Sequence, residues 1–228
     1  MKLARAMDIV LEKVCVDAEH LMQAWNIVLA AIEANKIAVD EVFGVYKQTL
    51  LHLACHRKDV SVAVVQRLLN LGASSSRATC EGKVAMHEAA LGFGHDSFEK
   101  CKILPAADLG CRTIHQQTPL HILAHELNFY AYYFSTNYRM VGRINRLEGM
   151  LRWMVDAVQC PVDAMDLWGR TAADIFCINA AAAPYASIVH SAAVWKRRWT
   201  PQRAAWIAAA CCKPCCTSRS PLPPGSSF

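Results

Sequence analysis

The chain has 228 residues, of which 54% are hydrophobic and 19% charged, so it is long enough for a packed core and excludes disorder over most of its length. Its formal net charge of +5 is concentrated after Asp174, where six basic and no acidic residues occur; the rest has 18 basic and 19 acidic residues. Any attraction to a polyanion therefore belongs to the C-terminal tail, and we expect no nucleic-acid partner.

The N-terminal part predicts two helices. Apolar residues recur at helical spacing over residues 3 to 15 and again over residues 18 to 34, as at Leu21, Trp25 and Val28 in the second stretch.

The central part contains a repeated motif. Its best copy is Thr118-Pro119-Leu120-His121-Ile122-Leu123-Ala124, and weaker copies occur at residues 49–54 and 84–89. The copies are 35 residues apart from His52 to His87 and 34 apart from His87 to His121. Threonine followed by proline is a favourable helix start, because the hydroxyl can accept from free backbone N–H groups and proline needs no N–H partner there. The period predicts stacked structural repeats.

This motif resembles the signature of the ankyrin repeat, Thr-Pro-Leu-His-x-Ala at about 33 residues. The resemblance implies a first helix that begins at Thr49, a second over residues 60 to 70, and a helix stop at Leu71-Gly72-Ala73. By the same comparison, Asn35 takes the left-handed position that closes the second helix of a divergent N-terminal repeat. In the next repeat Glu81-Gly82-Lys83 supplies the turn, and Pro105 predicts a short second helix.

The third repeat is longer than its neighbours. Asp166 to Asp174 resembles the opening of a further repeat, with Asp174 where the histidine would stand. His121 to Asp174 is 53 residues, so about 20 residues are inserted between the paired helices. The inserted stretch, Phe129 to Arg146, is rich in aromatic residues, and we expect a loop there because insertions in repeat proteins map to loops, often on a binding face.

The resemblance therefore implies an all-α ankyrin-type solenoid of about four repeats with divergent caps, short turn fingers and a disordered tail. We expect an N-terminal capping repeat over residues 1–45 and repeats over 46–79, 80–112 and 113–165, the last with the insertion. A C-terminal repeat with a capping helix follows over 166–210, and a cysteine-rich, then disordered tail over 211–228.

The C-terminal part carries two ambiguous features. Ile178 to Trp195 contains no charged side chain, but its alanines and Pro184 make it only weakly hydrophobic, so we predict a capping helix and not a membrane span. Four thiols then follow a basic, tryptophan-bearing segment, at Cys211, Cys212, Cys215 and Cys216. Three readings stay open: S-acylation with peripheral membrane contact, thiolate binding of zinc or copper(I), and no role.

The chain contains eleven cysteines, yet no secretory leader is legible at its start, so we expect a reducing compartment, a cytoplasmic location and mostly free thiols. Two histidine pairs four residues apart, His52 with His56 and His121 with His125, have the spacing of zinc hydrolases. Neither has glutamate directly after the first histidine, and no phosphate loop or nucleophile elbow occurs. We expect no catalysis, cofactor or metal.

What the resemblance implies instead is the binding of another protein by a chain that we expect to be monomeric. Ankyrin proteins use their finger tips and first helices. The finger candidates are Tyr46, Lys47, Arg77, Glu81, Arg112, Gln116, Trp168 and Arg170, and the candidates on the first helices are His56, Arg57, Phe93, His125 and Glu126. Trp168 is the strongest, since tryptophan is enriched at interface hot spots, unless it packs against the insertion. The alternative function is substrate recognition within an enzyme complex such as a ubiquitin ligase.

Overall fold

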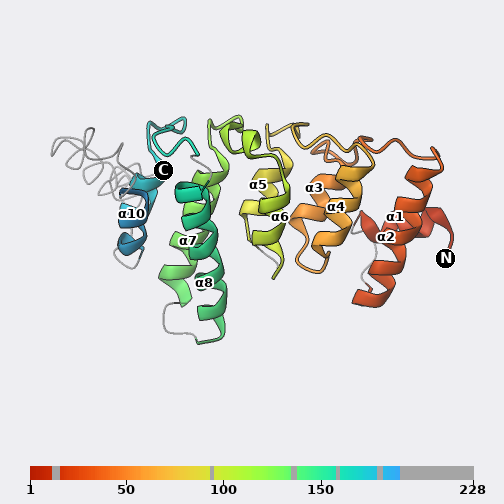
Figure 1. Ribbon diagram of the computed structural model, residues 1–228, viewed down its shortest axis with the longest axis horizontal. Helices are drawn as coiled ribbons and strands as arrows, with labels where there is room; N and C mark the ends of the chain where they lie inside the picture. The colour runs from red at the N-terminus through yellow and green to blue at the C-terminus, as the bar shows by residue number, and fades with distance from the viewer. Residues whose placement is uncertain (12–15, 93–94, 135–137, 158–159, 179–181, 191–228) are drawn as a thin grey trace, which may run out of the picture.

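Helices follow one another in pairs along the chain in the computed structural model, which describes residues 1–11, 16–92, 95–134, 138–157, 160–178 and 182–190 (Figure 1). The five pairs are α1 (Leu3–Val10) with α2 (Ala18–Glu33), α3 (Leu50–His56) with α4 (Val62–Asn70), α5 (Ala85–Ala90) with α6 (Ser97–Ile103), α7 (Pro119–Phe134) with α8 (Tyr138–Arg152), and α9 (Ala172–Cys177) with α10 (Ala183–His190). A 3₁₀ turn, Ala106–Gly110, follows α6, and a π turn, Trp153–Ala157, follows α8. No strand occurs in these residues, so the all-α repeat fold is confirmed.

The pairs stack in two layers. The first helices α3, α5, α7 and α9 contact one another in succession, and the second helices α2, α4, α6, α8 and α10 do the same. Because no repeat can bury its apolar face alone, each pair covers the core of its neighbour.

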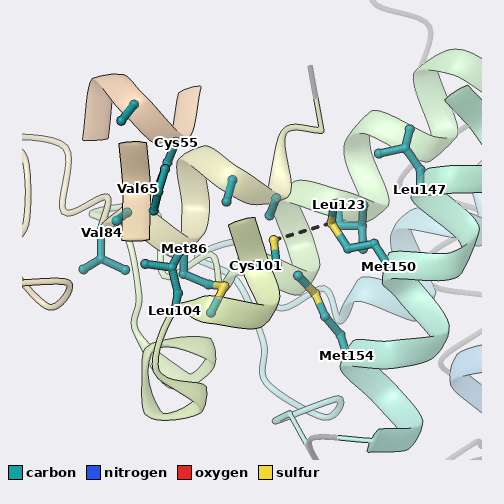
Figure 2. Close-up of a cluster of buried hydrophobic side chains, with 14 of the residues drawn as sticks. Cys55, Val65, Val84, Met86, Cys101, Leu104, Leu123, Leu147, Met150 and Met154 are labelled. Atoms are coloured by element: carbon teal, nitrogen blue, oxygen red, sulfur yellow. Dashed lines mark hydrogen bonds between the residues drawn. The ribbon is translucent and has the colours of Figure 1, made fainter. Parts of the chain in front are cut away.

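The core between the layers mixes aliphatic and sulfur side chains. Figure 2 shows Cys55, Met86 and Cys101 pointing into the same region as Met150, whose Sδ lies 3.8 Å from the Cys101 Sγ. Burial raises the pKa of the Cys55 thiol to about 12 and that of Cys101 further still. These cysteines therefore act as small apolar side chains, as the sequence predicted.

The predicted helix stops are confirmed. Gly72 has a φ of +89°, and the N–H of Ala73 donates to the carbonyl of Leu68. Asn35 has a φ of +55°, and the N–H of Lys36 donates to Ala31 in the same pattern. A left-handed residue after the last helical turn lets the chain reverse and satisfies carbonyls that the helix leaves open.

A tight turn precedes each of the first helices α3, α5, α7 and α9. We call these turns fingers 1 to 4, and they comprise residues 44–48, 79–83, 113–117 and 166–170. In fingers 2 to 4 the side-chain oxygen of the first residue accepts two N–H groups of the same turn, from Thr79, Thr113 and Asp166 respectively. The fourth residues, Lys47, Gly82, Gln116 and Gly169, all have positive φ, between 53° and 73°.

Backbone hydrogen bonds join successive fingers into one row, along the upper edge of Figure 1. In each case the N–H of a finger's second residue donates to the carbonyl of the preceding finger's third residue. The bonds run from Cys80 to Tyr46 (3.0 Å), from Ile114 to Glu81 (2.9 Å) and from Leu167 to His115 (2.9 Å).

The motif histidines attach the fingers to the helices. The Nδ1 of His52 accepts from the N–H of Thr49, and its Nε2 lies 3.0 Å from the carbonyl oxygen of Lys83, the last residue of finger 2. His87 and His121 repeat this arrangement toward the last residues of fingers 3 and 4. A backbone N–H can only donate, so Nδ1 accepts and Nε2–H donates, which requires the neutral ring. At the fourth position Asp174 accepts from the N–H of Thr171, as predicted for the histidine's place.

The prediction of an aromatic loop between the helices of the third repeat was wrong. The inserted residues lengthen both helices: α7 has 16 residues where α3 has 7, and α8 has 15 where α4 has 9. The additional turns project away from the fingers (Figure 1). The cause is an apolar face that continues at helical spacing, through the buried Leu120, Leu127 and Ala131.

The second helix of the second repeat is short, as Pro105 predicted, and it carries a fully buried lysine. The Nζ of Lys100 donates to the carbonyl oxygens of Ala54 at 2.9 Å and Arg57 at 2.7 Å. These carbonyls belong to the C-terminal end of α3, where the helix leaves acceptors open and its dipole favours a cation. Burial lowers the pKa of Lys100.

Across the part of the chain that the structure describes, no helix is long and apolar enough to cross a membrane. The weakly hydrophobic stretch from Ile178 to Trp195 contributes α10, which packs on α9.

We predict that acid weakens the stack before carboxylates are protonated. Burial lowers the pKa of His87 from 6.5 to about 4, and it also lowers the pKa of His52 and of His121. Between pH 6.5 and 4 the unfolded chain binds a proton at His87 that the folded chain does not, so the free energy of unfolding falls, by about 3 kcal/mol at this site. Urea unfolding between pH 7 and 4 measures this loss. The free energy of unfolding should depend less steeply on pH in His87→Gln and as steeply as in the wild type in His95→Gln, the control, because His95 is exposed. An unchanged pH dependence in His87→Gln contradicts the prediction.

A second prediction concerns the buried lysine. Lys100→Met keeps the apolar stem but leaves two buried carbonyls without their donor, so we expect it to reduce the free energy of unfolding by about 2–3 kcal/mol. Lys102→Met is the control on the same helix, because Lys102 is exposed, pairs with Glu99 and lies over the Phe98 ring at the surface; its loss costs less than about 1 kcal/mol. Equal effects in urea unfolding would refute this role of Lys100.

Candidate partner-binding surface

A groove of about 360 Å³ lies where fingers 1 and 2 meet the helices α3 and α5. It is open to solvent, and its lining comes from both fingers and both helices: Tyr46, Gln48, Leu53, His56, Thr79, Glu81, Lys83, Glu88 and Leu91. Three of the predicted partner-binding residues, Tyr46, His56 and Glu81, therefore meet in one place. They are far apart in the sequence, but equivalent positions of successive repeats stack on one another, which brings them together.

Two paired sets of charges define the chemistry of the groove. Glu88 is only 3% exposed, and one of its carboxylate oxygens lies 2.9 Å from Nδ1 of His56. Burial alone would raise the pKa of Glu88, but the hydrogen bond and positive charge of His56, together with Lys83, lower it below its usual value. The carboxylate is therefore ionised at neutral pH.

The second pair joins Lys83 and Glu81, two lining residues of the groove, at 2.8 Å. Burial alone would lower the pKa of Lys83, but the hydrogen bond with Glu81 and the charges of Glu88 and Glu81 raise it. Each charge in the groove thus has an opposite neighbour. Such a site favours partner groups that can exchange hydrogen bonds with both signs of charge, over a strongly charged ion.

Trp168 lies at the other end of the finger row and is 51% exposed. Its ring stacks on His115 of finger 3, with centroids 5.6 Å apart, and the Arg170 guanidinium lies 4.9 Å from the ring centroid. Asp166 holds Arg170 in place by two hydrogen bonds of 2.8 and 2.9 Å. These contacts hold the indole beside the fingers, and half of it is open to solvent.

The remaining predicted residues differ in how much side chain they present. Tyr46, Lys47, Arg77, Arg112 and Gln116 are exposed, whereas His56, Arg57, Glu81, His125, Glu126 and Arg170 are partly buried, and Phe93 lies outside the described residues.

Several of these side chains are already occupied within the molecule. Arg57 pairs with Asp59 and donates to the carbonyl of Ile9, and Glu126 lies 3.9 Å from Arg143. Gln117 contacts His125 at 3.3 Å. His125 and Glu126 do not line the groove, and they belong to the longer helix α7.

Sequence reasoning missed the groove residues Lys83, Glu88 and Leu91. The repeat period could have indicated Glu88, because this residue directly follows a motif histidine at the start of a first helix, in the repeat after the one that contains His56. The two histidine pairs at zinc-hydrolase spacing have other roles: both ring nitrogens of His52 and of His121 are used by the helix start and the next finger. The cysteines proposed for S-acylation or metal binding lie outside the described residues.

The finger, the paired helices and the motif histidine together match a known repeat. The family model of the ankyrin repeat matches residues 46–79, which contain the end of finger 1, the helices α3 and α4, and the first residue of finger 2. The chain therefore contains an ankyrin repeat at these residues. A search of curated proteins found no match to the chain. Ankyrin repeats are typically non-catalytic modules of protein–protein interaction.

A third prediction tests the electrostatics of the groove. Glu88→Gln removes the charge that His56 and Lys83 stabilise, so we expect a loss of about 1–2 kcal/mol in the free energy of unfolding at pH 7. The folded-state pKa lies below the ordinary 4.5, so the carboxylate's stabilising contribution is present above pH 4.5 and disappears as the pH falls through the folded value.

The difference between wild type and Glu88→Gln should therefore narrow below pH 4.5 in urea unfolding. Glu81→Gln is the control, because this carboxylate is more exposed and its pair contributes less. A difference that stays constant down to pH 3 would show that the charge of Glu88 does not stabilise the fold.

Proposed function

We propose that this protein is a non-catalytic adaptor that binds a partner protein through its fingers and first helices. The groove supports this proposal most strongly. It is open to solvent and is lined by hydrogen-bonding groups from two repeats. One of its charges, the carboxylate of Glu88, is buried and held in place. Preformed sites of this kind lower the entropic cost of association, because the side chains are already ordered.

The chemistry of the buried thiols of Cys55 and Cys160 also favours binding over covalent catalysis. Burial raises the pKa of Cys55 and of Cys160 to about 12, so both are protonated near neutral pH. A protonated, buried thiol is a poor nucleophile. The groove itself is lined by two ion pairs, in each of which the two charges face one another. Tyr46, Gln48 and Thr79 add further hydrogen-bonding groups, and such a lining suits the recognition of a polar partner surface.

We include the tip of finger 4 in the proposed interface. Trp168 offers a large, amphipathic surface at a low cost in side-chain entropy, and Arg170 next to it is fixed by Asp166. Arg77 and Arg112 are exposed just before fingers 2 and 3. A partner that touches both ends would therefore cross the whole finger row.

The fourth prediction is that Trp168→Ala weakens partner capture without unfolding the chain. Half of the indole is exposed, so its removal should lower the free energy of unfolding by less than about 1 kcal/mol. Capture of the partner in affinity purification should fall about tenfold if Trp168 is a hot spot. The matched control is Phe129→Ala, an equally exposed aromatic residue on α7, away from the fingers.

The same purification separates the alternatives. The full chain is compared with a chain that lacks residues 195–228. A protein captured by both and lost with Trp168→Ala supports the adaptor. Membrane proteins captured only with the tail would favour anchoring by an S-acylated tail, and ligase components would favour the substrate-recognition role. A large fall in melting temperature on Trp168→Ala would contradict its assignment to the interface.

A further inference from the structure

The second residue of every finger has an exposed side chain that is either apolar or a thiol. Val45 is 83% exposed, Ile114 57% and Leu167 61%, and Cys80 is also exposed. We call these four residues the finger ridge. They occupy equivalent positions in the four turns, and in fingers 2 to 4 they directly follow the residue whose side-chain oxygen organises the turn. None of them belongs to the residues that the sequence motif assigned to the interface.

The fold does not require apolar side chains at these positions. The backbone N–H groups of Cys80, Ile114 and Leu167 form the bonds between fingers, which any residue except proline could provide. The side chains contribute little burial, and a polar residue would be better solvated. Because stability gives no reason for this choice, the ridge points to a function outside the fold itself.

Exposed apolar residues in the described part of the chain are concentrated near the fingers. Of the ten exposed large hydrophobic side chains among the described residues, seven lie in the fingers or within three residues of them. These seven are Val42, Val45, Tyr46, Ile114, Met165, Leu167 and Trp168. Single exposed apolar residues are normal, but a group on one edge marks an interaction surface.

The geometry of the ridge fits a linear partner segment. Hydrogen bonds join each finger to the next, so the ridge side chains follow one another at a spacing fixed by the stack, along one edge of the molecule (Figure 1). A row with one apolar side chain per repeat is matched by a chain segment with apolar side chains along one side.

The charges near the ridge indicate what accompanies those apolar side chains. Lys47, Arg77 and Arg112 are exposed in or beside fingers 1 to 3, and no carboxylate among the described residues pairs with Lys47 or Arg77. The acidic groups within fingers 2 and 4 are already neutralised, Glu81 by Lys83 and Asp166 by Arg170. The exposed Glu41 just before finger 1 is one carboxylate beside three basic side chains, so the excess charge beside fingers 1 to 3 is positive.

We propose that the finger ridge binds a linear segment of the partner that carries aliphatic or aromatic side chains interspersed with carboxylates. The apolar side chains pack on Val45, Cys80, Ile114 and Leu167, and the carboxylates pair with Lys47, Arg77 and Arg112. This inference rests on the proposed function, because it specifies the chemistry of the partner that the fingers recognise.

The test uses a random 16-residue peptide library displayed on phage and selected on the full chain. Enriched peptides should carry a net negative charge and at least two aliphatic or aromatic residues. Affinities of the enriched peptides are then measured by fluorescence anisotropy. The ridge variant Val45→Ser/Ile114→Ser/Leu167→Ser should bind at least about tenfold more weakly. The variant Lys47→Glu/Arg77→Glu/Arg112→Glu should lose affinity for acidic peptides and select basic ones.

The matched control is Phe129→Ser/Ile178→Ser, which removes exposed apolar side chains away from the fingers and should change affinity by less than about twofold. Circular dichroism melting checks that the ridge variant folds, which its exposed positions favour. The inference is overturned by basic or purely polar peptides, by affinities that the ridge variant leaves unchanged, or by the absence of enrichment.

The outcomes also separate this inference from the proposed function. If the affinity for the peptides falls only in Glu88→Gln or Trp168→Ala, the ridge is not their binding site, whereas the proposed adaptor function is still supported. Partner capture that depends on none of the groove, Trp168 and the ridge would overturn the adaptor itself.

Discussion

The two-sided hydrogen bonding of the motif histidine is the interaction on which the architecture depends. Its Nδ1 accepts from the N–H at the start of a first helix, and its Nε2–H donates to the last carbonyl of the next finger, as in His87 with Val84 and Gln117. One ring thus caps a helix and holds the following repeat in place. A buried neutral ring satisfies both partners, whereas a protonated ring would place a second N–H against the donor at Nδ1. Asp174, which stands in the place of the motif histidine in the last repeat, performs only one half of this role. Its carboxylate caps α9 as the histidines cap the earlier first helices, but an ionised carboxylate has no proton to donate to another finger. The helix start can therefore tolerate the exchange, whereas the link between repeats cannot. Among the described residues, finger 4 is the last that a motif histidine holds.

The sequence predicted those features of the fold that depend on local backbone chemistry. The spacing of His52, His87 and His121 located the first helices, and Gly72 located a helix stop, because only a few residues tolerate its left-handed conformation. Asn35 was identified by the same reasoning, although its repeat lacks the motif. The loop predicted for the insertion in the third repeat was wrong, because its aromatic content and the general tendency of insertions to form loops received more weight than the continuous helical spacing from Leu120 to Ala131. Periodicity was the better guide, because burial of one helix face stabilises a longer helix without a new loop.

The candidate site was predictable only in part, for a different physical reason. A repeat period tells which positions are equivalent, so it placed Tyr46, His56 and Glu81 near the fingers and first helices. It does not tell which polar side chains of neighbouring repeats turn toward each other. The pairing of His56 with Glu88 depends on the rotation of α3 relative to α5, which follows from the packing of side chains in the core. The exposure of Val45, Ile114 and Leu167 was equally hidden, since an apolar residue in a sequence is first assigned to the core.

The fold and the proposed interface share the same atoms, and this has a consequence for binding. Lys83 accepts the hydrogen bond of His52 through its carbonyl, while its ammonium group pairs with Glu81 at the groove. Arg170 accepts the bond of His121 through its carbonyl, while its guanidinium lies over Trp168. The backbone of each of these residues is therefore fixed by the stack before any partner arrives. A surface whose backbone is already ordered loses less conformational entropy on binding than a free loop. The same bonds make recognition dependent on the stack. Protonation of His52 or His121 adds a proton at Nδ1 and breaks its bond to the N–H at the helix start, so the ring that holds the carbonyl of Lys83 or Arg170 loses its own anchor, and both ends of the interface loosen together.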